Sequence, residues 1–402
     1  MKSPLLSEDA IYRILRDLLR AELRRMRGTW DSDADFPQNT VFPDAPWHTD
    51  SMEIMEMAAA VTEFFHLHKS GLEDNLLRFK KMGQWIETVA ISRKHFPEEI
   101  TFRTSGSTGE PLPRSHRMED MMQEIRELAG IFKNRKRILS FVPAHHIYGF
   151  LFTVLLPAEM GIGVRDGRDT GTGIPAAGIR PGDLLISFPA HWSFLERSLA
   201  GLPEDVEGVS STAPMPPQLI RRIAEKGISR FSEIYGSSAH GGIGYRHKTG
   251  QPFRLFSYLH PAAFPADENT LLVRTYPNGK PRVFPAEDLL EWEDEKHFYV
   301  RCRRDGAVQV GGINVYPETV AEKIRAHPLV ADCAVRLMKD REIPRLKAFI
   351  VPETDREKDI LIRELRGWMQ QHLHTAEIPL HLRLGEKLPR NEMGKNRDWR
   401  TD

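Results

Sequence analysis

The stretch TSGSTGEP, residues 104–111, decides the fold class of this chain. It follows the strand-like run ITFRTS (100–105) and precedes apolar residues at helical spacing over 118–132. Its hydroxyls and backbone N–H groups are suited to surround phosphate oxygens, and its glycines allow turns that side chains would obstruct. No Gly-Lys-Ser/Thr triplet follows, so it is not a Walker-type phosphate loop. An ordinary polar turn is the alternative interpretation.

The residues before this stretch are predicted to be helical. Ser7 is suited to cap a helix over 7–26 whose apolar side chains share one face. Segments 51–65 and 73–90 repeat the helical pattern after a loop rich in Asp, Pro and Asn. The apolar face of the first helix comprises Ile11, Leu15, Leu18, Leu19, Leu23 and Met26. We therefore expect an all-helical segment over residues 1–95.

The residues after this stretch alternate between apolar runs and helical patterns. Runs such as ILSFVP and DLLISFP, separated by helices, indicate an α/β catalytic domain over 96–304. Helices over 318–326 and 356–372, with short strands, indicate a small α+β domain over 305–402. The strands expected in the small domain are 307–310, 334–337 and 346–351. The predicted fold class is α/β: a large catalytic domain, a small C-terminal α+β domain and a helical N-terminal segment.

Composition narrows the classes of function. The 402 residues include 56 Lys and Arg and 56 Asp and Glu, so no net field favours nucleic acid or an anionic membrane. No apolar run approaches the roughly 18 residues that a membrane-spanning helix needs. Cys302 and Cys333 have no metal-ligand spacing, and the N-terminus lacks the apolar core of a signal peptide. We expect a cytoplasmic, reduced protein with no membrane span and no cluster of metal-ligating side chains.

Further motifs follow in order up to residue 395. They are FVPAHHIYGF (141–150), VSSTAPMP (209–216), IYGSSAHGG (234–242), EDL (287–289), CRRD (302–305), VGGINVYP (310–317) and LPRNEMGK (388–395). With the first stretch, they resemble the motifs of the adenylate-forming enzymes, which include acyl-CoA synthetases, aryl-CoA ligases, luciferases and peptide-synthetase adenylation domains. The resemblance implies that ATP activates a carboxylic acid as an acyl-AMP, whose acyl group is then transferred to a thiol.

The resemblance also implies roles for individual residues. The loop would hold the β- and γ-phosphates of ATP through Thr104, Ser105, Gly106, Ser107, Thr108 and Gly109. The adenine and acyl pocket would be lined by His146, Ala213, Tyr235, Gly236 and Ser237. Asp288, assisted by Arg303, would accept hydrogen bonds from the ribose hydroxyls. Lys395 would lie at the acyl carboxylate and α-phosphate, where negative charge develops as pyrophosphate leaves.

Two further assignments concern movement of the small domain. Asp305 would be the hinge, and Gly311 and Gly312 would belong to the loop that enters the site for thioester formation. A β-bulge is the structural alternative for the two glycines. A buried core histidine is the alternative for His146, and the FPAHW segment (188–192) fits the pocket and the core equally well.

Three positions depart from the family pattern. The lysine of the phosphate loop is replaced by Leu112, so Arg114 would have to supply its contact. The first glycine of GRxD is Cys302. The acidic residue of YGxTE is Ala239, which removes an oxygen ligand that the family provides to Mg2+. These departures leave open a catalytically degenerate chain that binds a nucleotide or presents an acyl group.

The N-terminal helices resemble acyl carrier proteins. TDSMEIMEMAAAVTEFF (49–65) is similar to the DSL helix of these carriers, and residues 71–89 are similar to their closing helices. Ser51 would then be the phosphopantetheine attachment point, because a helix N-terminus favours a phosphodiester anion. A helical subdomain that serves only for packing is the alternative.

The combined expectation is an AMP-forming acid–thiol ligase that uses ATP and Mg2+. Its substrate would be a small carboxylic acid, and the acceptor would be CoA or the phosphopantetheine of an acyl carrier protein. The compact chain is similar to aryl-CoA ligases of the phenylacetate type, so an aromatic or unsaturated acid is the favoured substrate class.

Overall fold

The computed structural model of the chain divides into two compact units. The first contains Met1–Thr104, Leu112–Ser211 and Ile220–Leu259, and the second contains Ser105–Pro111, Thr212–Leu219 and His260–Asp402. The described residues are 6–28, 37–44, 47–105, 111–168, 178–264, 270–277, 279–303, 306–338, 344–354, 357–389 and 399. The side chains of residues 104, 105, 111, 302 and 303 are not described. The domain boundaries expected at residues 95 and 304 stay predictions.

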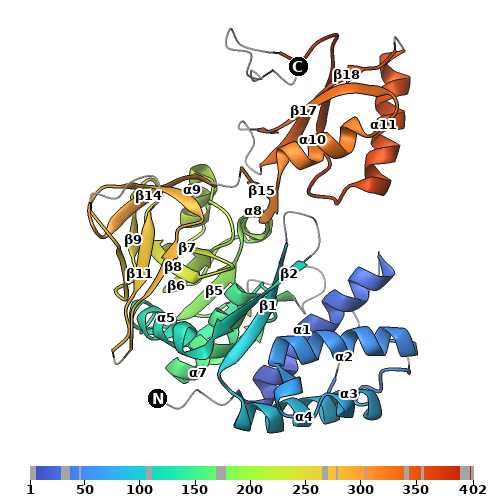
Figure 1. The fold of residues 1–402 in the computed structure, drawn as a ribbon. Helices are drawn as coiled ribbons and strands as arrows, with labels where there is room; N and C mark the ends of the chain where they lie inside the picture. Colours follow the sequence, from blue (N-terminus) through green and yellow to red (C-terminus); the bar gives the residue numbers. More distant parts are fainter. Residues whose placement is uncertain are drawn as a thin grey trace. The chain divides into compact units, whose positions relative to one another are not determined.

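Helices form the N-terminal part of the first unit. They are α1 (Glu8–Arg27), α2 (Ser51–Phe65), η1 (Leu67–Lys69), α3 (Asp74–Arg78) and α4 (Met82–His95). Ser7 caps α1 as predicted, since its hydroxyl accepts a hydrogen bond from the Ala10 N–H at 3.2 Å. The expected apolar face of α1 is buried except for the half-buried Met26. Figure 1 shows α1 beside α2 and α4, which it contacts.

The single helix expected over 73–90 is wrong. The chain leaves the helical conformation at Phe79 and Lys81, where the backbone is extended. The reason is tertiary: the Phe42 N–H donates to the Lys80 carbonyl at 3.0 Å, and Val41 and Lys81 form a β-bridge. Pairing with this distant segment therefore overrides the local helical pattern.

A parallel sheet with helices on both faces forms the rest of the first unit. Within this unit the strand order is β9-β8-β7-β6-β5-β3-β4; β3 to β7 are parallel, and β8 and β9 are antiparallel additions. The strands are β3 (Arg137–Ser140), β4 (Gly163–Asp166), β5 (Asp183–Ser187), β6 (Val206–Ser210), β7 (Ile228–Ser237), β8 (Gly241–Arg246) and β9 (Phe253–Leu255). The helices are α5 (Met118–Ile131), α6 (Ile147–Phe150), the π-helical η2 (Leu151–Leu155), α7 (Leu156–Met160), α8 (Pro189–Ser198) and α9 (Pro217–Glu225). The expected strand at 100–105 is β1 (Glu99–Ser105), paired with β2 (Pro111–Arg117).

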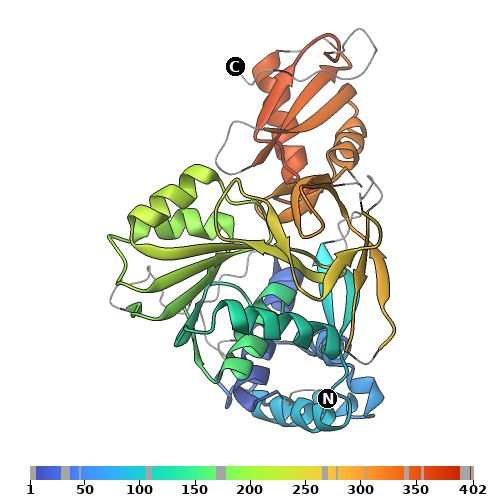
Figure 2. The ribbon, with the colours of Figure 1, turned by 90° about the vertical axis from the view of Figure 1, so that its left-hand side faces the viewer.

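Two neighbouring residues of β7 show that helices cover both faces of the sheet. Phe231 packs edge-on against Trp192 of α8, with ring centroids 5.1 Å apart. Arg230, the preceding residue, donates to the carbonyl oxygen of Ile131 at the end of α5. Successive side chains of a strand point to opposite faces, so α8 and α5 cover opposite sides of the sheet (Figure 2).

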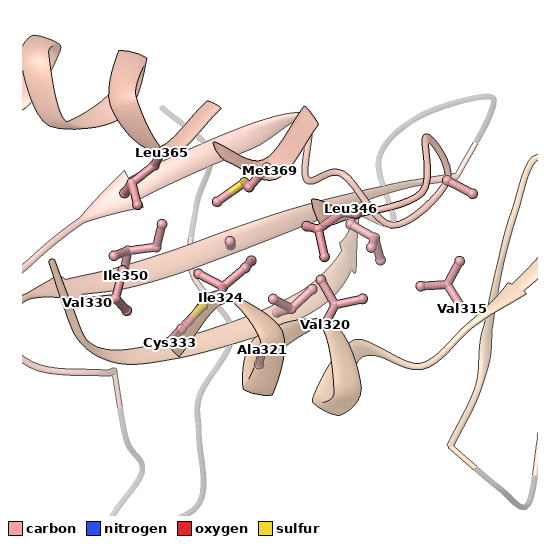
Figure 3. Packing of buried hydrophobic residues seen from close by; sticks show 14 of the residues in the cluster. Val315, Val320, Ala321, Ile324, Val330, Cys333, Leu346, Ile350, Leu365 and Met369 are labelled. Carbon is pink, nitrogen blue, oxygen red and sulfur yellow. The ribbon is translucent and has the colours of Figure 1, made fainter. Parts of the chain in front are cut away.

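The second unit contains β-hairpins and an α+β segment. Its strands and helices are β11 (Leu271–Arg274), β12 (Arg282–Pro285), β13 (Asp288–Trp292), β14 (His297–Arg303), β15 (Val308–Val310), β16 (Ile313–Val315), α10 (Pro317–Arg325), β17 (Val330–Met338), β18 (Arg345–Pro352), α11 (Lys358–His372) and β19 (His381–Leu384); β10 (Leu259–Pro261) begins in the first unit. Figure 3 shows α10 residues such as Ile324 and α11 residues such as Leu365 packed with Ile350 of β18. This core confirms the predicted α+β character of the C-terminal part, although β19 was not expected.

Among the described residues, no helix is both long enough and apolar enough to cross a membrane.

Candidate active site

Two residues expected at the ribose lie opposite each other in one hairpin. Asp288 is the first residue of β13 and is 8% exposed. Its partner across the antiparallel ladder is Arg303, the last residue of β14. Side chains of directly opposed residues have Cβ atoms roughly 4.5–5.5 Å apart. The backbone therefore places positions 288 and 303, the two positions expected at the ribose, directly opposite each other.

A tight turn carries the residues expected at the adenine. Tyr235, Gly236 and Ser237 end β7, and β8 returns antiparallel to it with Gly236 opposite Gly242. A Cβ on Gly236 would lie 2.5 Å from the Gly241 carbonyl oxygen, so only glycine fits. The turn allows the backbone to pass this close to its own return strand and keeps Tyr235 and Ser237 at the carboxyl end of β7.

A buried carboxylate of helix α5 holds the turn between β7 and β8. Glu124 of α5 is 2% exposed and accepts a hydrogen bond from the Gly242 N–H at 2.8 Å. His116 adds a second contact, with its Nε2 2.8 Å from the Ser238 carbonyl oxygen. Sequence reasoning missed Glu124, because nothing in the sequence links position 124 to position 242. The turn that lacks the family acid at Ala239 is thus supported by an acid from α5.

Glu233 is a nearby acid that could replace the missing one, but Arg246 already binds its carboxylate. It is 5% exposed, and its two oxygens accept from Arg246 at 2.7 and 3.0 Å. Breaking a buried ion pair of this kind costs about 3 to 5 kcal/mol. No cluster of three or more His, Cys, Asp or Glu side chains able to hold a metal occurs in the described part of the chain.

The segment after β6 begins with a strained residue. Ser211 donates from its hydroxyl to the Ile234 carbonyl oxygen at 2.9 Å, which ties the ends of β6 and β7 together. Thr212 then has a φ of +76°, although a β-branched side chain strongly disfavours this region. Ala213, expected at the acyl pocket, follows and is half-buried. Such strain occurs where the surrounding structure imposes it, commonly at binding sites.

Gly311 and Gly312 form the turn of a two-residue β-hairpin. Val310 pairs with Ile313 on either side of them, and their φ values are +61° and +86°. The β-bulge alternative is therefore wrong, because both glycines lie in the connection between β15 and β16. Positive φ at both positions is typical of a type I′ turn, which favours glycine. A Cβ on Gly312 would lie 3.1 Å from Thr212 Oγ1, so this turn tolerates little bulk.

The histidines after β3 and β5 differ in environment. His146 is exposed, so it is not a core residue, yet enough protein surrounds it to lower its pKa by desolvation. Trp192 belongs to the core: it is 1% exposed and donates to the Val209 carbonyl oxygen. His191 is half-buried, and burial lowers its pKa to about 4. The structure thus separates the two members of the FPAHW segment that the sequence left undecided.

Several predicted site residues lie outside the described residues. Gly106, Ser107, Thr108, Gly109, Asp305 and Lys395 are not described, and only the backbone strand assignments of Thr104, Ser105 and Arg303 are available. Ser51 is exposed and opens α2 after the N-cap Asp50, as the helical prediction required. Its modification and the carrier-like character of the N-terminal helices stay predictions.

Known proteins align with nearly the whole length of this chain. Residues 319–395 match the family model of the AMP-binding enzyme C-terminal domain. A 4-coumarate–CoA ligase of Halorhodospira halophila is 35% identical over 97% of this chain and 99% of its own length. One from Rhodobacter capsulatus is 34% identical over 97% of this chain and 100% of its own. Because these alignments span the N-terminal helices, that segment is not an addition specific to this chain.

Solved structures agree on the fold. An amide bond synthetase from Marinactinospora thermotolerans aligns with a TM-score of 0.60 at 14% identity, over 96% of this chain and 92% of its own. The o-succinylbenzoate CoA synthetase of Bacillus subtilis aligns with a TM-score of 0.56 at 19% identity, over 74% of this chain and 67% of its own. At such identities the likeness concerns the fold alone.

Proposed function

Because this chain belongs to the AMP-forming CoA ligases of the adenylate-forming family, we propose that it joins a 4-coumarate-like aromatic acid to CoA. The observation that carries the proposal is the match of at least 34% identity to two 4-coumarate–CoA ligases over their full or nearly full lengths. It favours the ligase over the degenerate nucleotide-binding alternative. It also favours free CoA over a carrier protein as the acyl acceptor.

The first half-reaction assigns a binding role to the nucleotide residues. Asp288 accepts hydrogen bonds from the two ribose hydroxyls, and Arg303, opposite it in the hairpin, assists it in our proposal. Tyr235 and Ser237 border the adenine at the end of β7. With the nucleotide so oriented, a carboxylate oxygen of the acid attacks the α-phosphorus in line with the leaving pyrophosphate. Lys395 donates to the oxygens on which negative charge accumulates.

The groups that would hold Mg2+ follow from the oxygen atoms that the site offers. Mg2+ supplies positive charge to the phosphate oxygens when it is bound. The described residues offer no cluster of carboxylates for it, and Ala239 adds no oxygen. Phosphate oxygens, water and the hydroxyls of the phosphate loop would hold it, a set compatible with the preference of Mg2+ for oxygen and water.

The second half-reaction forms the thioester. The CoA sulfur attacks the acyl carbon, the carbon–sulfur bond forms, the bond to the phosphate oxygen breaks, and AMP leaves with the electron pair. The hairpin turn at Gly311 and Gly312 presents backbone without side-chain bulk, which suits a narrow passage for a thiol. Asp305 precedes this hairpin and serves as the hinge in our proposal.

A two-stage assay tests the proposed function. The purified chain is incubated with ATP, Mg2+ and one acid at a time: 4-coumarate, cinnamate, phenylacetate or a medium-chain fatty acid. Pyrophosphate release reports the first stage, and mass spectrometry of the thioester after addition of CoA reports the second. We expect both signals with the hydroxycinnamate and weak signals with the fatty acid. Pyrophosphate release without a CoA thioester would contradict the choice of acceptor.

A further inference from the structure

The strand order of the first unit marks one position on the sheet edge. The chain places β4 on one side of β3 and then crosses to place β5 on the other side, giving the order β4-β3-β5-β6-β7. Open parallel sheets bind ligands beyond the carboxyl ends of their strands, where the order reverses in this way. In this chain that position is occupied by Phe141, directly after β3, and by the residues that follow Ser187 at the end of β5. Figure 1 labels β5 and α8 at this junction.

Aromatic rings meet at this position. His191 stacks on Phe141, with ring centroids 4.9 Å apart and planes inclined by 25°. Phe188 and Phe194 lie 5.8 and 5.6 Å from the same imidazole. Phe194 is 47% exposed, so solvent reaches the edge of this group. Flat, partly exposed rings are suited to pack against another aromatic ring.

Two imidazoles that both lie near Arg168, those of His191 and His145, retain hydrogen-bonding capacity. Ser187 Oγ lies 2.9 Å from His191 Nδ1, which fixes the ring and leaves Nε2 with no hydrogen-bond partner in the described part of the structure. His145 follows β3, and its Nδ1 is buried without a partner among the described residues. Burial lowers the pKa of both side chains, so they are neutral at pH 7. A neutral imidazole offers one donor and one acceptor.

The charges around these histidines are balanced. Arg168 donates to both oxygens of Asp17 at 2.9 Å and also binds Asp166. Arg16, which is 4% exposed, binds Asp166 as well. Asp17 in turn accepts from the Ala144 N–H at 2.6 Å, which fixes the loop that leads into His145. Two arginines thus face two aspartates, and these four described side chains together carry no net positive charge that would attract a phosphate or a carboxylate.

We infer that His191, with His145, binds the polar substituent on the aromatic ring of the acid, a neutral phenolic hydroxyl. This inference rests on the proposed function and adds the group that distinguishes 4-coumarate from cinnamate. The aromatic rings hold the ring of the acid, and the free imidazole nitrogens exchange hydrogen bonds with its hydroxyl. A substrate without the hydroxyl leaves these nitrogens unpaired, which is how a polar site rejects an apolar analogue.

A matched pair of acids and variants tests the inference. Cinnamate lacks only the ring hydroxyl of 4-coumarate, and His191→Phe keeps an aromatic ring on Phe141 while removing both nitrogens. We expect the ratio of kcat/KM for 4-coumarate to that for cinnamate to fall on the order of tenfold or more in the variant. His297→Phe, at a half-buried histidine of β14, should keep the wild-type ratio.

The alternative outcomes are distinguishable. Equal loss of activity toward both acids, with the ratio unchanged, would assign His191 a packing role and overturn the inference. If His191→Phe does not fold, Ser187→Ala releases His191 Nδ1, and an unchanged ratio in that variant overturns it as well. Calorimetric titration with both acids separates failure of the proposed function from failure of the role given to His191. A wild type that activates neither acid contradicts the proposed function, whereas equal affinity for both acids contradicts the role of His191.

Discussion

The Lys347 ammonium group donates a hydrogen bond to the Trp399 carbonyl oxygen at 2.5 Å. Both residues are buried, with 6% and 7% of their surface exposed. The indole packs edge-on against Phe349, with centroids 5.7 Å apart, and lies in a small apolar cluster with Ala334. The chain is therefore fixed to β18 four residues after Lys395. An extended chain of four residues spans at most about 14 Å.

Removing this attachment should slow acyl-AMP formation more than thioester formation. We expect Trp399→Ala to reduce pyrophosphate release about tenfold or more, because the segment with Lys395 loses its fixed end. Thioester formation from supplied acyl-AMP should change little, since in our proposal Lys395 acts in the first stage only. Trp399→Phe, which keeps a ring against Phe349, should restore much of the activity. Equal loss in both stages would point to general destabilisation of the small domain instead.

The charge of Lys395 itself should act on the transition state. In Lys395→Ala we expect acyl-AMP formation to fall on the order of a hundredfold or more, the effect of losing about 3 to 4 kcal/mol of electrostatic stabilisation. ATP affinity, measured by calorimetry, should change far less. Lys387→Ala removes an exposed lysine eight positions earlier and serves as the control. Wild-type pyrophosphate release in Lys395→Ala would refute the assignment.

The turn at the end of β7 leads to a prediction about the metal. Ala239 gives Mg2+ no oxygen ligand, so we expect adenylation to require elevated Mg2+, and Ala239→Glu to lower that requirement by adding a charged ligand. Rates measured across a Mg2+ titration check this. A wild type that saturates at ordinary Mg2+ would show that another group takes the role.

If another group takes this role, the structure argues against Glu233. Glu233 is bound by Arg246 through both oxygens, so Glu233→Gln should lower stability without changing the Mg2+ dependence. Asp288 is then the acid to vary, and a variant there should also weaken ATP binding through the ribose. The two variants therefore separate structural from metal-related effects.

The sequence predicted local elements well and long-range contacts poorly. The cap at Ser7 and the strand at 100–105 depend on a few adjacent residues, and both were predicted correctly. The break between α3 and α4 was missed, because it depends on pairing with residues near 41. The contact between Glu124 and Gly242, and the stack of His191 on Phe141, join positions that only the sheet topology brings together. Motif spacing predicted the nucleotide residues, whose roles stay predictions, and only the fold showed which neighbours contact them.

The strain at Thr212 gives the last prediction. A β-branched residue at a φ of +76° costs roughly 1 to 2 kcal/mol relative to a residue that tolerates this region. The Thr212 side chain is exposed, so Thr212→Asn removes little packing while Asn accepts the left-handed conformation more readily. We expect the free energy of unfolding to rise by about 1 kcal/mol in chemical denaturation. Thr354→Asn, at an exposed threonine with ordinary backbone, should stay within about 0.5 kcal/mol of the wild type.

Thr212→Asn also shows whether the backbone strain at Thr212 contributes to activity. Thr212 precedes Ala213 at the predicted acyl pocket, and Ser211 before it is tied to Ile234. If the strained backbone sets the position of Ala213, Thr212→Asn should lower kcat/KM for the preferred acid while raising stability, the exchange expected at a binding site. Greater stability with unchanged kinetics would mean that the strain follows from the connection after β6 and has no part in binding the acid.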